Sequence, residues 1–186
     1  TLAAEYGNQP LADACLAAGV RARAAFRVRF WCHDTDFPYD CVSESRDAQD
    51  AWVDPSIRPN ALIALAVDPS LFEEWQARAI VARVRAELLT PRGIRSLSPL
   101  DPRYVSQFAG TLEERELGYH QGTAWTHLLG FYVRAAMRLS PDDEELRDEL
   151  RTRDVTVRRT GGDAGVCEAD REQLEFALRS LFVGVA

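Results

Sequence analysis

Apolar residues recur at steps of three and four along much of the chain, which is the spacing of one face of an α-helix. The first stripe predicts a helix of about five turns over 11–30, with Asn8 as its cap and Pro10 near its first turn. Because small residues dominate the stripe, we expect this helix to approach its neighbours closely. The stripe consists of Leu11, Cys15, Ala18, Ala22, Phe26 and Phe30.

Further helices are predicted over 60–67, 70–89, 123–139 and 170–182, with another starting near 142. Ser70 and Glu73 have the spacing of a capping box at the start of the helix over 70–89, and Glu87 is expected on its wet side. The buried stripe predicted for that helix is Ala77, Ile80, Val81, Val84 and Leu88. The face predicted for the helix over 123–139 is Trp125, Leu128, Leu129, Tyr132, Ala136 and Leu139.

The segments between these helices lack the periodicity. Over 31–42, short apolar clusters flank a polar turn and Pro38 excludes a helix, so we expect a short hairpin-like excursion. The polar segment 43–56 reads as a surface loop with Trp52 as a candidate anchor. A long loop over 94–118 is expected to carry function, because long ordered loops in compact domains usually do.

Repetition of helix, loop and helix with a faint sheet signal predicts an all-α protein of antiparallel helix pairs with long functional loops. The length suits a single domain over 1–186, and 46% apolar with 27% charged residues suits a soluble globular chain. No apolar run approaches the roughly 18 residues of a membrane span, so no membrane partner is expected. The chain begins with Thr1 and has no secretory signal, and we expect a processed product or a fragment.

Charge and cysteine usage narrow the function further. Twenty-two basic against 29 acidic residues give a net charge of −7, which disfavours nucleic acid as a partner. The four cysteines form no C-x-x-C pair, so free thiols in a reducing cytoplasm are expected. Part of a metal site at Cys32, His33 and Cys41 is the less favoured alternative, and no metal is predicted.

The richest chemistry lies in the stretch 118–130. Tyr119 and Trp125 offer flat apolar faces for sugar rings, and His120 and Gln121 offer hydrogen bonds to hydroxyl groups. The alternative is that these aromatic residues belong to the core. At the start of the helix over 60–67, Arg58 and Asn60 suit an acceptor-rich ligand or a structural carboxylate equally well.

Four blocks of the sequence carry a resemblance to a known family. They are Arg29-Phe30-Trp31 with Tyr39-Asp40, then 57–60 (Ile-Arg-Pro-Asn), then 88–99, and then 119–125 (Tyr-His-Gln-Gly-Thr-Ala-Trp). In this order they resemble the C-terminal amylo-alpha-1,6-glucosidase domain of glycogen debranching enzymes, of which this chain would be the later half. The resemblance implies a partial (α/α)6 toroid of paired helices around a glucan pocket.

The resemblance also implies hydrolysis of an alpha-1,6-linked glucose by two carboxyl groups, without a metal or organic cofactor. The catalytic candidates are Glu116 and Glu168, with Asp101 and Asp40 less favoured. The residues implied to bind the substrate are Tyr119, His120, Gln121, Gly122 and Trp125, together with Arg58 and Asn60.

The partners implied are an alpha-glucan or limit dextrin, and either the missing N-terminal half of the domain or a second copy of the chain. A non-catalytic glucan-binding module and a helical scaffold whose aromatic residues are all core are the alternative functions.

Overall fold

Helices make up most of the computed structural model, which describes residues 2–43 and 52–149. The α-helices are α1 (Leu2–Glu5), α2 (Gln9–Arg29), α3 (Asn60–Val67), α4 (Glu74–Arg83), α5 (Leu112–Tyr119) and α6 (Leu129–Leu139). Two 3-10 turns, η1 (Pro69–Leu71) and η3 (Thr126–Leu128), and one π-helical turn, η2 (Val84–Leu88), adjoin them. Residues 144–149 are also helical.

Short antiparallel strands join these helices. Strands β1 (Trp31–Cys32) and β2 (Phe37–Pro38) form the hairpin expected at this point, and β3 (Cys41–Val42) pairs with β4 (Val53–Asp54). A three-stranded sheet contains β5 (Leu89–Thr90), β6 (Gly93–Arg95) and β7 (Ala124–Trp125), with β6 in the middle. The prediction of a purely all-α protein is therefore corrected to a helix-rich fold with small sheets. Strands of two or three residues are too short for an alternating pattern to reveal them.

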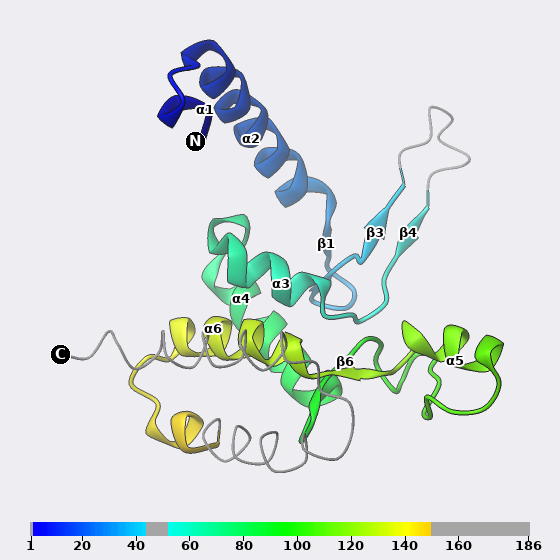
Figure 1. Cartoon of the computed structure of the whole chain (residues 1–186). Helices are drawn as coiled ribbons and strands as arrows, with labels where there is room; N and C mark the ends of the chain where they lie inside the picture. The colour runs from blue at the N-terminus through cyan, green and yellow to red at the C-terminus, as the bar shows by residue number, and fades with distance from the viewer. Residues whose placement is uncertain (1, 44–51, 150–186) are drawn as a thin grey trace.

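The core lies where α3, α4 and α6 pack together in the body of the molecule (Figure 1). Leu62 of α3, Ile80 of α4 and Tyr132 of α6 are fully buried there. The β1–β2 hairpin contributes Phe37 to the same core. Most of the apolar stripes predicted for α4 and α6 are buried, with Val81, Trp125 and Leu139 at their partly exposed margins.

Helix α2 differs from its prediction, because its apolar stripe is not packed along its length. Among its described residues only Ala12 is buried, and the helix extends away from the body (Figure 1). Its C-terminal end is anchored, since the ring of Phe26 meets that of Phe72 edge-on at 5.5 Å and Arg23 pairs with Asp68. The predicted cap is present, with Asn8 accepting the Leu11 amide. Periodicity identifies an apolar face, but it does not supply the element that covers it.

Two helix starts lie later than predicted. Asp68 caps the short turn η1, and the capping box is made by Glu73 and Gln76, so α4 begins at Glu74. The helix predicted from 123 begins only at Leu129, because residues 124 and 125 pair with β6. The later helix start near 142 is confirmed, with Asp143 accepting the amide of Leu146. The helix predicted over 170–182 lies outside the described residues.

Two surface assignments were wrong. The Trp52 side chain is exposed at the edge of β4 and does not anchor the segment through burial, although its backbone pairs with Ser43. Glu87 is not on the wet side of its helix, because its side chain is only 11% exposed. The π-helical turn carries Glu87 inward, where its carboxylate accepts the hydroxyl of Ser98 and pairs with Arg83.

Candidate functional site

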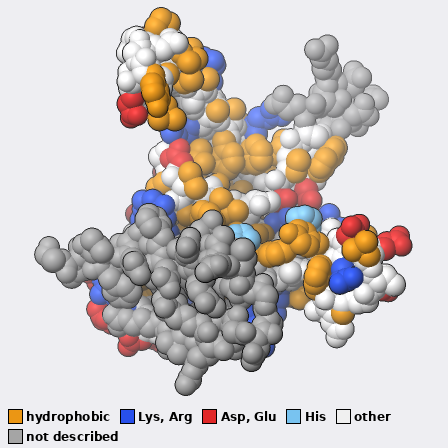
Figure 2. Space-filling view, viewed as in Figure 1, with side chains coloured by type: hydrophobic (Ala, Val, Ile, Leu, Met, Phe, Trp, Pro, Cys, Tyr) orange, Lys and Arg blue, Asp and Glu red, His pale blue; other side chains and the backbone are white. Residues whose placement is uncertain are grey.

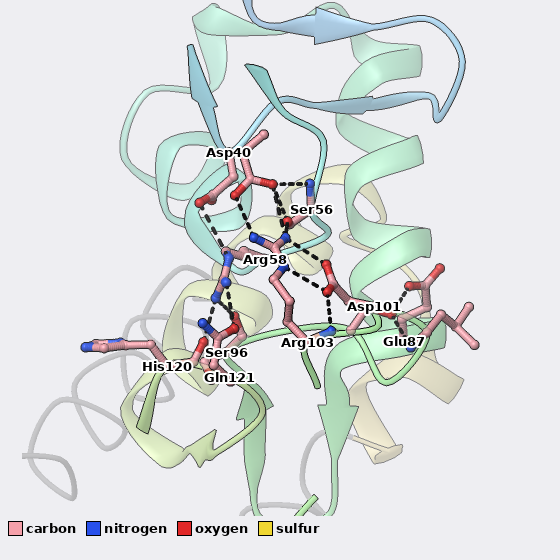
Figure 3. A network of polar contacts seen from close by, with 12 residues as sticks. Asp40, Ser56, Arg58, Glu87, Ser96, Asp101, Arg103, His120 and Gln121 are labelled. Carbon is pink, nitrogen blue, oxygen red and sulfur yellow. Dashed lines mark hydrogen bonds and ion pairs between the residues drawn. The ribbon is translucent and has the colours of Figure 1, made fainter. Parts of the chain in front are cut away.

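Arg58 is the centre of a polar network that joins three segments far apart in the sequence (Figure 3). Its Nη1 donates to the carbonyl oxygens of Ser96 at 3.0 Å and His120 at 2.6 Å, and its Nη2 donates to Oε1 of Gln121 at 3.0 Å. Its Nε lies 3.7 Å from Oδ2 of Asp40. The guanidinium therefore fixes the 119–122 turn against the start of α3, and little of its donor capacity is left over.

Gln121 and Gly122 shape this turn from behind. Gln121 serves as a partner of Arg58, and its carbonyl accepts the Val105 amide at 2.6 Å. The amide of Gly122 donates to the Ser96 hydroxyl at 2.9 Å. Gly122 has φ +146°, and a Cβ there would lie 2.4 Å from the Val105 carbonyl oxygen. Neither residue is among those that line the pocket beside the turn.

The pocket is an open hollow of about 270 Å³ between the start of α3, the 119–120 turn and the start of η3. This volume suits a ligand of the size of a single sugar ring, since pockets for larger, drug-sized ligands begin at roughly 300 Å³. Five residues predicted for the site line it, namely Arg58, Asn60, Tyr119, His120 and Trp125. Its other lining residues are Pro59, Ile63, Ser96, His127 and Leu128.

The pocket contains an aromatic wall. The ring centroids of Tyr119 and Trp125 are 4.6 Å apart at 65°, and His120 and His127 lie beside these two rings at 4.7 and 5.9 Å respectively. Figure 2 shows histidine side chains next to an orange apolar patch on this face. Pairing of Trp125 with Ile94 in the sheet places the indole, and the capping box at Thr111 orders the helix that ends at Tyr119.

Ser96 and His127 were missed as site residues. Ser96 lies in the segment 94–118, for which the sequence predicts only a long functional loop, and its place in the pocket depends on the pairing of β6 with β7. His127 stands two positions after Trp125 inside a segment that periodicity assigned to a helix. Its position on the 3-10 turn η3, which a helical pattern does not reveal, brings it to the pocket.

Asp40 lies behind Arg58 and Asn60. Asn60 Nδ2 donates to Asp40 Oδ1 at 2.7 Å, and the side chain of Asp40 is 16% exposed. Burial raises the pKa of the Asp40 carboxyl, while the hydrogen bond from Asn60 and the charge of Arg58 act in the opposite direction. The sequence left open whether Arg58 and Asn60 face a ligand or a structural carboxylate. In the structure both side chains line the pocket and both also contact the carboxylate of Asp40.

A second ion-pair cluster supports the loop before Arg58. Arg103 donates to both oxygens of Asp101, to Asp54 and to the hydroxyl of Ser56. The hydrogen bond from Arg103 lowers the pKa of Asp101 to about 2. Asp101 is therefore a fixed anion near neutral pH, which does not suit a group that must give or take a proton.

Neither of the two favoured catalytic candidates is among the described lining residues. Glu116 is exposed on α5 and does not line the pocket, and Glu168 lies outside the described residues. Among the lining residues that the structure describes there is no carboxylate. The described pocket can stack a sugar ring and bind its hydroxyl groups.

Residues 2–43 and 52–149 contain no group of three or more His, Cys, Asp or Glu side chains able to hold a metal ion. Cys15, Cys32 and Cys41 are free thiols, and Cys167 lies outside these ranges. Within them, no helix has both the length and the apolar character to cross a membrane.

The fold and the pocket together define a helix-rich protein with a small aromatic and hydrogen-bonding hollow, a composition that carbohydrate sites use. Comparison with known proteins identifies the family. The model of the amylo-alpha-1,6-glucosidase family matches residues 14–161, most of the chain. The chain therefore belongs to the amylo-alpha-1,6-glucosidase family.

One curated relative is the glycogen debranching enzyme of Saccharomyces cerevisiae (strain ATCC 204508 / S288c). It is 32% identical to this chain over 90 residues, which cover 45% of this chain and 6% of the yeast protein. The chain therefore corresponds to a small part of that enzyme.

Proposed function

We propose that this chain is part of a glucosidase of the glycogen debranching type and that its pocket binds a terminal glucose residue of an alpha-glucan. The convergence of Arg58, Asn60, His120 and Trp125 on one hollow of single-sugar size carries this proposal. Membership of the family supports it. We also propose that the protein is cytoplasmic. In the same proposal, these helices form one sector of the (α/α)6 toroid of a longer parent enzyme.

In this proposal the pocket binds and orients the sugar. The faces of Trp125 and Tyr119 cover the apolar side of the ring, while His120 and Asn60 contact its hydroxyl groups. Hydrolysis with inversion needs a carboxylic acid that protonates the leaving oxygen and a carboxylate that activates water, roughly 6.5–9.5 Å apart. The family resemblance makes Glu168 the candidate for one of these roles and Glu116 the candidate for the other.

A second candidate function is a glucan-binding module without activity. The same observation favours it, because the described lining residues supply stacking and hydrogen bonds but no carboxylate. The two functions make different demands on the chain. A glucosidase must release glucose, whereas a binding module must bind an oligosaccharide and leave it intact.

The test is to titrate the full chain with maltooligosaccharides while following tryptophan fluorescence, and to assay glucose release from a limit dextrin. Sugar binding is expected to change the fluorescence of Trp125. The chain has four tryptophans, so Trp125→Phe tests the origin of the signal and should abolish the change. His120→Ala is expected to weaken binding about tenfold, because a lost hydrogen bond costs about 1–1.5 kcal/mol. The exposed His33→Ala is the matched control and should leave binding unchanged.

The outcomes separate the hypotheses. Binding with glucose release that Glu168→Gln abolishes supports the glucosidase, and binding without release supports the module. If no sugar binds and Trp125→Ala unfolds the chain, the aromatic residues are core and both sugar-binding proposals are wrong. Melting temperature and circular dichroism of each variant show whether a loss of binding reflects a loss of fold.

A further inference from the structure

Asp40 contacts two pocket-lining side chains without lining the pocket itself. Figure 3 shows it at one end of the Arg58 guanidinium, with Ser96, His120 and Gln121 at the other end. Its backbone is also held, since the Asp40 amide donates to the carbonyl oxygen of Asp54 at 2.7 Å. The carboxylate therefore has a fixed position from which it acts on the pocket.

The contact with Asp40 fixes the orientation of the Asn60 side-chain amide. A side-chain amide has a donor end and an acceptor end, and its orientation follows from its hydrogen bonds. With one Nδ2 hydrogen donated to Asp40 Oδ1 at 2.7 Å, the Oδ1 and the second Nδ2 hydrogen of Asn60 are left for a ligand hydroxyl. Without an acceptor at Asp40, the amide loses the bond that selects this orientation.

The contact with Arg58 completes the support of the 119–122 turn. The Asp40 carboxylate lies 3.7 Å from the Nε of Arg58, the guanidinium nitrogen that does not donate to Ser96, His120 or Gln121. The remaining nitrogens donate to Ser96, His120 and Gln121, which hold the turn that presents His120 to the pocket. A negative charge at Asp40 favours the guanidinium orientation that makes all of these bonds together.

We propose that Asp40 is a positioning residue, which orients Asn60 and Arg58 for sugar binding only while its carboxyl group is ionised. This inference rests on the proposed function, since it concerns how the same pocket binds its sugar. Protonation would remove the attraction to Arg58 and leave the carboxyl group a weaker acceptor for Asn60. Binding should then weaken as Asp40 takes up a proton.

Charged groups around Asp40 act in both directions. Arg58 and Arg103 favour the ionised carboxylate, as does the hydrogen bond from Asn60, whereas burial and the charge of Asp54 disfavour it. The net effect raises the pKa of Asp40, with burial the largest contribution. The acid limb of sugar binding should therefore lie at a higher pH than an exposed aspartate would give.

The experiment measures the dissociation constant of maltotetraose from pH 4 to 7 for the full chain and for Asp40→Asn. Binding to the wild type is expected to weaken toward acid pH. Asp40→Asn should bind several-fold more weakly at pH 7 and show less of this dependence on pH. Any contribution from the imidazoles of His120 and His127 is common to both proteins, so the difference between the two profiles isolates Asp40.

Two further variants separate positioning from general structural support. Asp142→Asn, a change at an exposed position that does not line the pocket, is the control and should leave the affinity and its pH dependence unchanged. Asn60→Ala removes the hydrogen bond that opposes the raised pKa of Asp40, so its acid midpoint should move to higher pH. If Asp40→Asn fails to fold, the acid midpoint of maltotetraose binding by Asn60→Ala is the deciding measurement. A merely structural role of Asp40 would not shift that midpoint.

Each result has a definite meaning. If the wild type binds sugar and Asp40→Asn has the same affinity and pH profile, the role of Asp40 is wrong while the pocket stands. An unshifted midpoint in Asn60→Ala likewise contradicts the role of Asp40. If the wild type binds no maltotetraose at any pH, the proposed function and this inference fall together.

Discussion

Single ion pairs connect distant loops in this molecule, and Arg103 is the clearest case. It joins Asp54, at the end of β4, to Asp101, in the loop that follows β6. Ser56 completes the cluster and lies two residues before Arg58. The cluster therefore holds the segment that delivers Arg58 to the pocket. Because half of the Arg103 side chain is exposed, we expect each pair to stabilise the fold by at most about 1 kcal/mol.

Asp101 is expected to make the stability of the chain sensitive to strong acid. Its pKa is lowered from 3.8 to about 2, so the ionised group stabilises the folded state above about pH 4, and this contribution is lost as the pH falls toward 2. Asp101→Asn should lower the melting temperature at pH 7 and remove part of its decline between pH 4 and 2. Thermal unfolding monitored by circular dichroism measures both effects. The exposed Asp142→Asn is the control, and equal acid sensitivity in all three proteins would contradict the prediction.

Residue chemistry found part of the site from sequence alone. The sequence predicted Trp125, His120 and Arg58 as site residues, because aromatic, imidazole and guanidinium side chains that follow loops are typical of ligand sites. The pairing of Asp40 with Asn60 joins residues 20 positions apart, and that of Arg58 with Gln121 joins residues 63 apart. Contacts of this range do not follow from local spacing, so sequence reasoning did not give Gln121 its structural role.

At the scale of elements, the sheet of β5, β6 and β7 positions the aromatic wall. Gly93 on β6 lies directly against the backbone of β7, where a Cβ would stand 2.6 Å from the carbonyl carbon and oxygen of Trp125. The amide of Thr126 would be at 2.8 Å. These neighbours are backbone atoms rather than flexible side chains, so a larger residue at Gly93 must displace the strand that carries the indole.

Gly93→Ala is expected to destabilise the fold by about 1–3 kcal/mol and to weaken sugar binding, because it overpacks this strand pair. Denaturant unfolding and the maltooligosaccharide titration measure the two effects. Gly19→Ala in α2 is the matched control, since a Cβ there meets nothing within 4 Å. That change should be neutral or stabilise α2 by about 0.5–1 kcal/mol, as alanine favours helix more than glycine does. Equal effects of Gly93→Ala and Gly19→Ala on stability and sugar binding would contradict the close packing of Gly93 against β7.

Local signals predicted these elements unevenly. Helix α3 has the predicted limits, because Pro59 and the apolar run after it act within the helix itself. The helix predicted over 123–139 begins only at Leu129, since residues 124–125 form β7 and residues 126–128 form η3, and pairing with β6 outweighs the helical pattern of this segment. The capping box predicted to start at Ser70 starts at Glu73 instead, where the amide of Glu73 donates to the side chain of Gln76.

At the scale of the whole molecule, burial is concentrated in one part of the chain. Helices α3, α4 and α6 bury most of their apolar side chains against one another. Helix α2 contributes mainly Phe26 at its C-terminal end, while Leu11, Leu16 and Val20 are more than half exposed. Figure 2 shows orange side chains on the outer surface of this helix. Local stability should therefore decline from the core toward the N-terminus.

Hydrogen exchange should report this gradient. Amides in the first half of α2, over 9–20, are expected to exchange much faster than those of α6, because opening there exposes little buried apolar surface. Mass spectrometry of exchanged peptides measures the two exchange rates. Ala12→Gly should accelerate exchange in α2 without affecting exchange in α6. Protection of 9–20 equal to that of α6 would contradict the prediction and show that α2 is covered in solution.

The sequence by itself determined which segments form most of the helices, the family, and five of the residues that line the pocket. These properties depend on residue type and on spacing along the chain. Only the tertiary structure decided that α2 stands away from the core, that Gln121 and Gly122 support the pocket from behind, and that Asp40 lies beneath it. The physical reason is that burial and pairing depend on which distant segment lies opposite, and a one-dimensional pattern does not specify that partner.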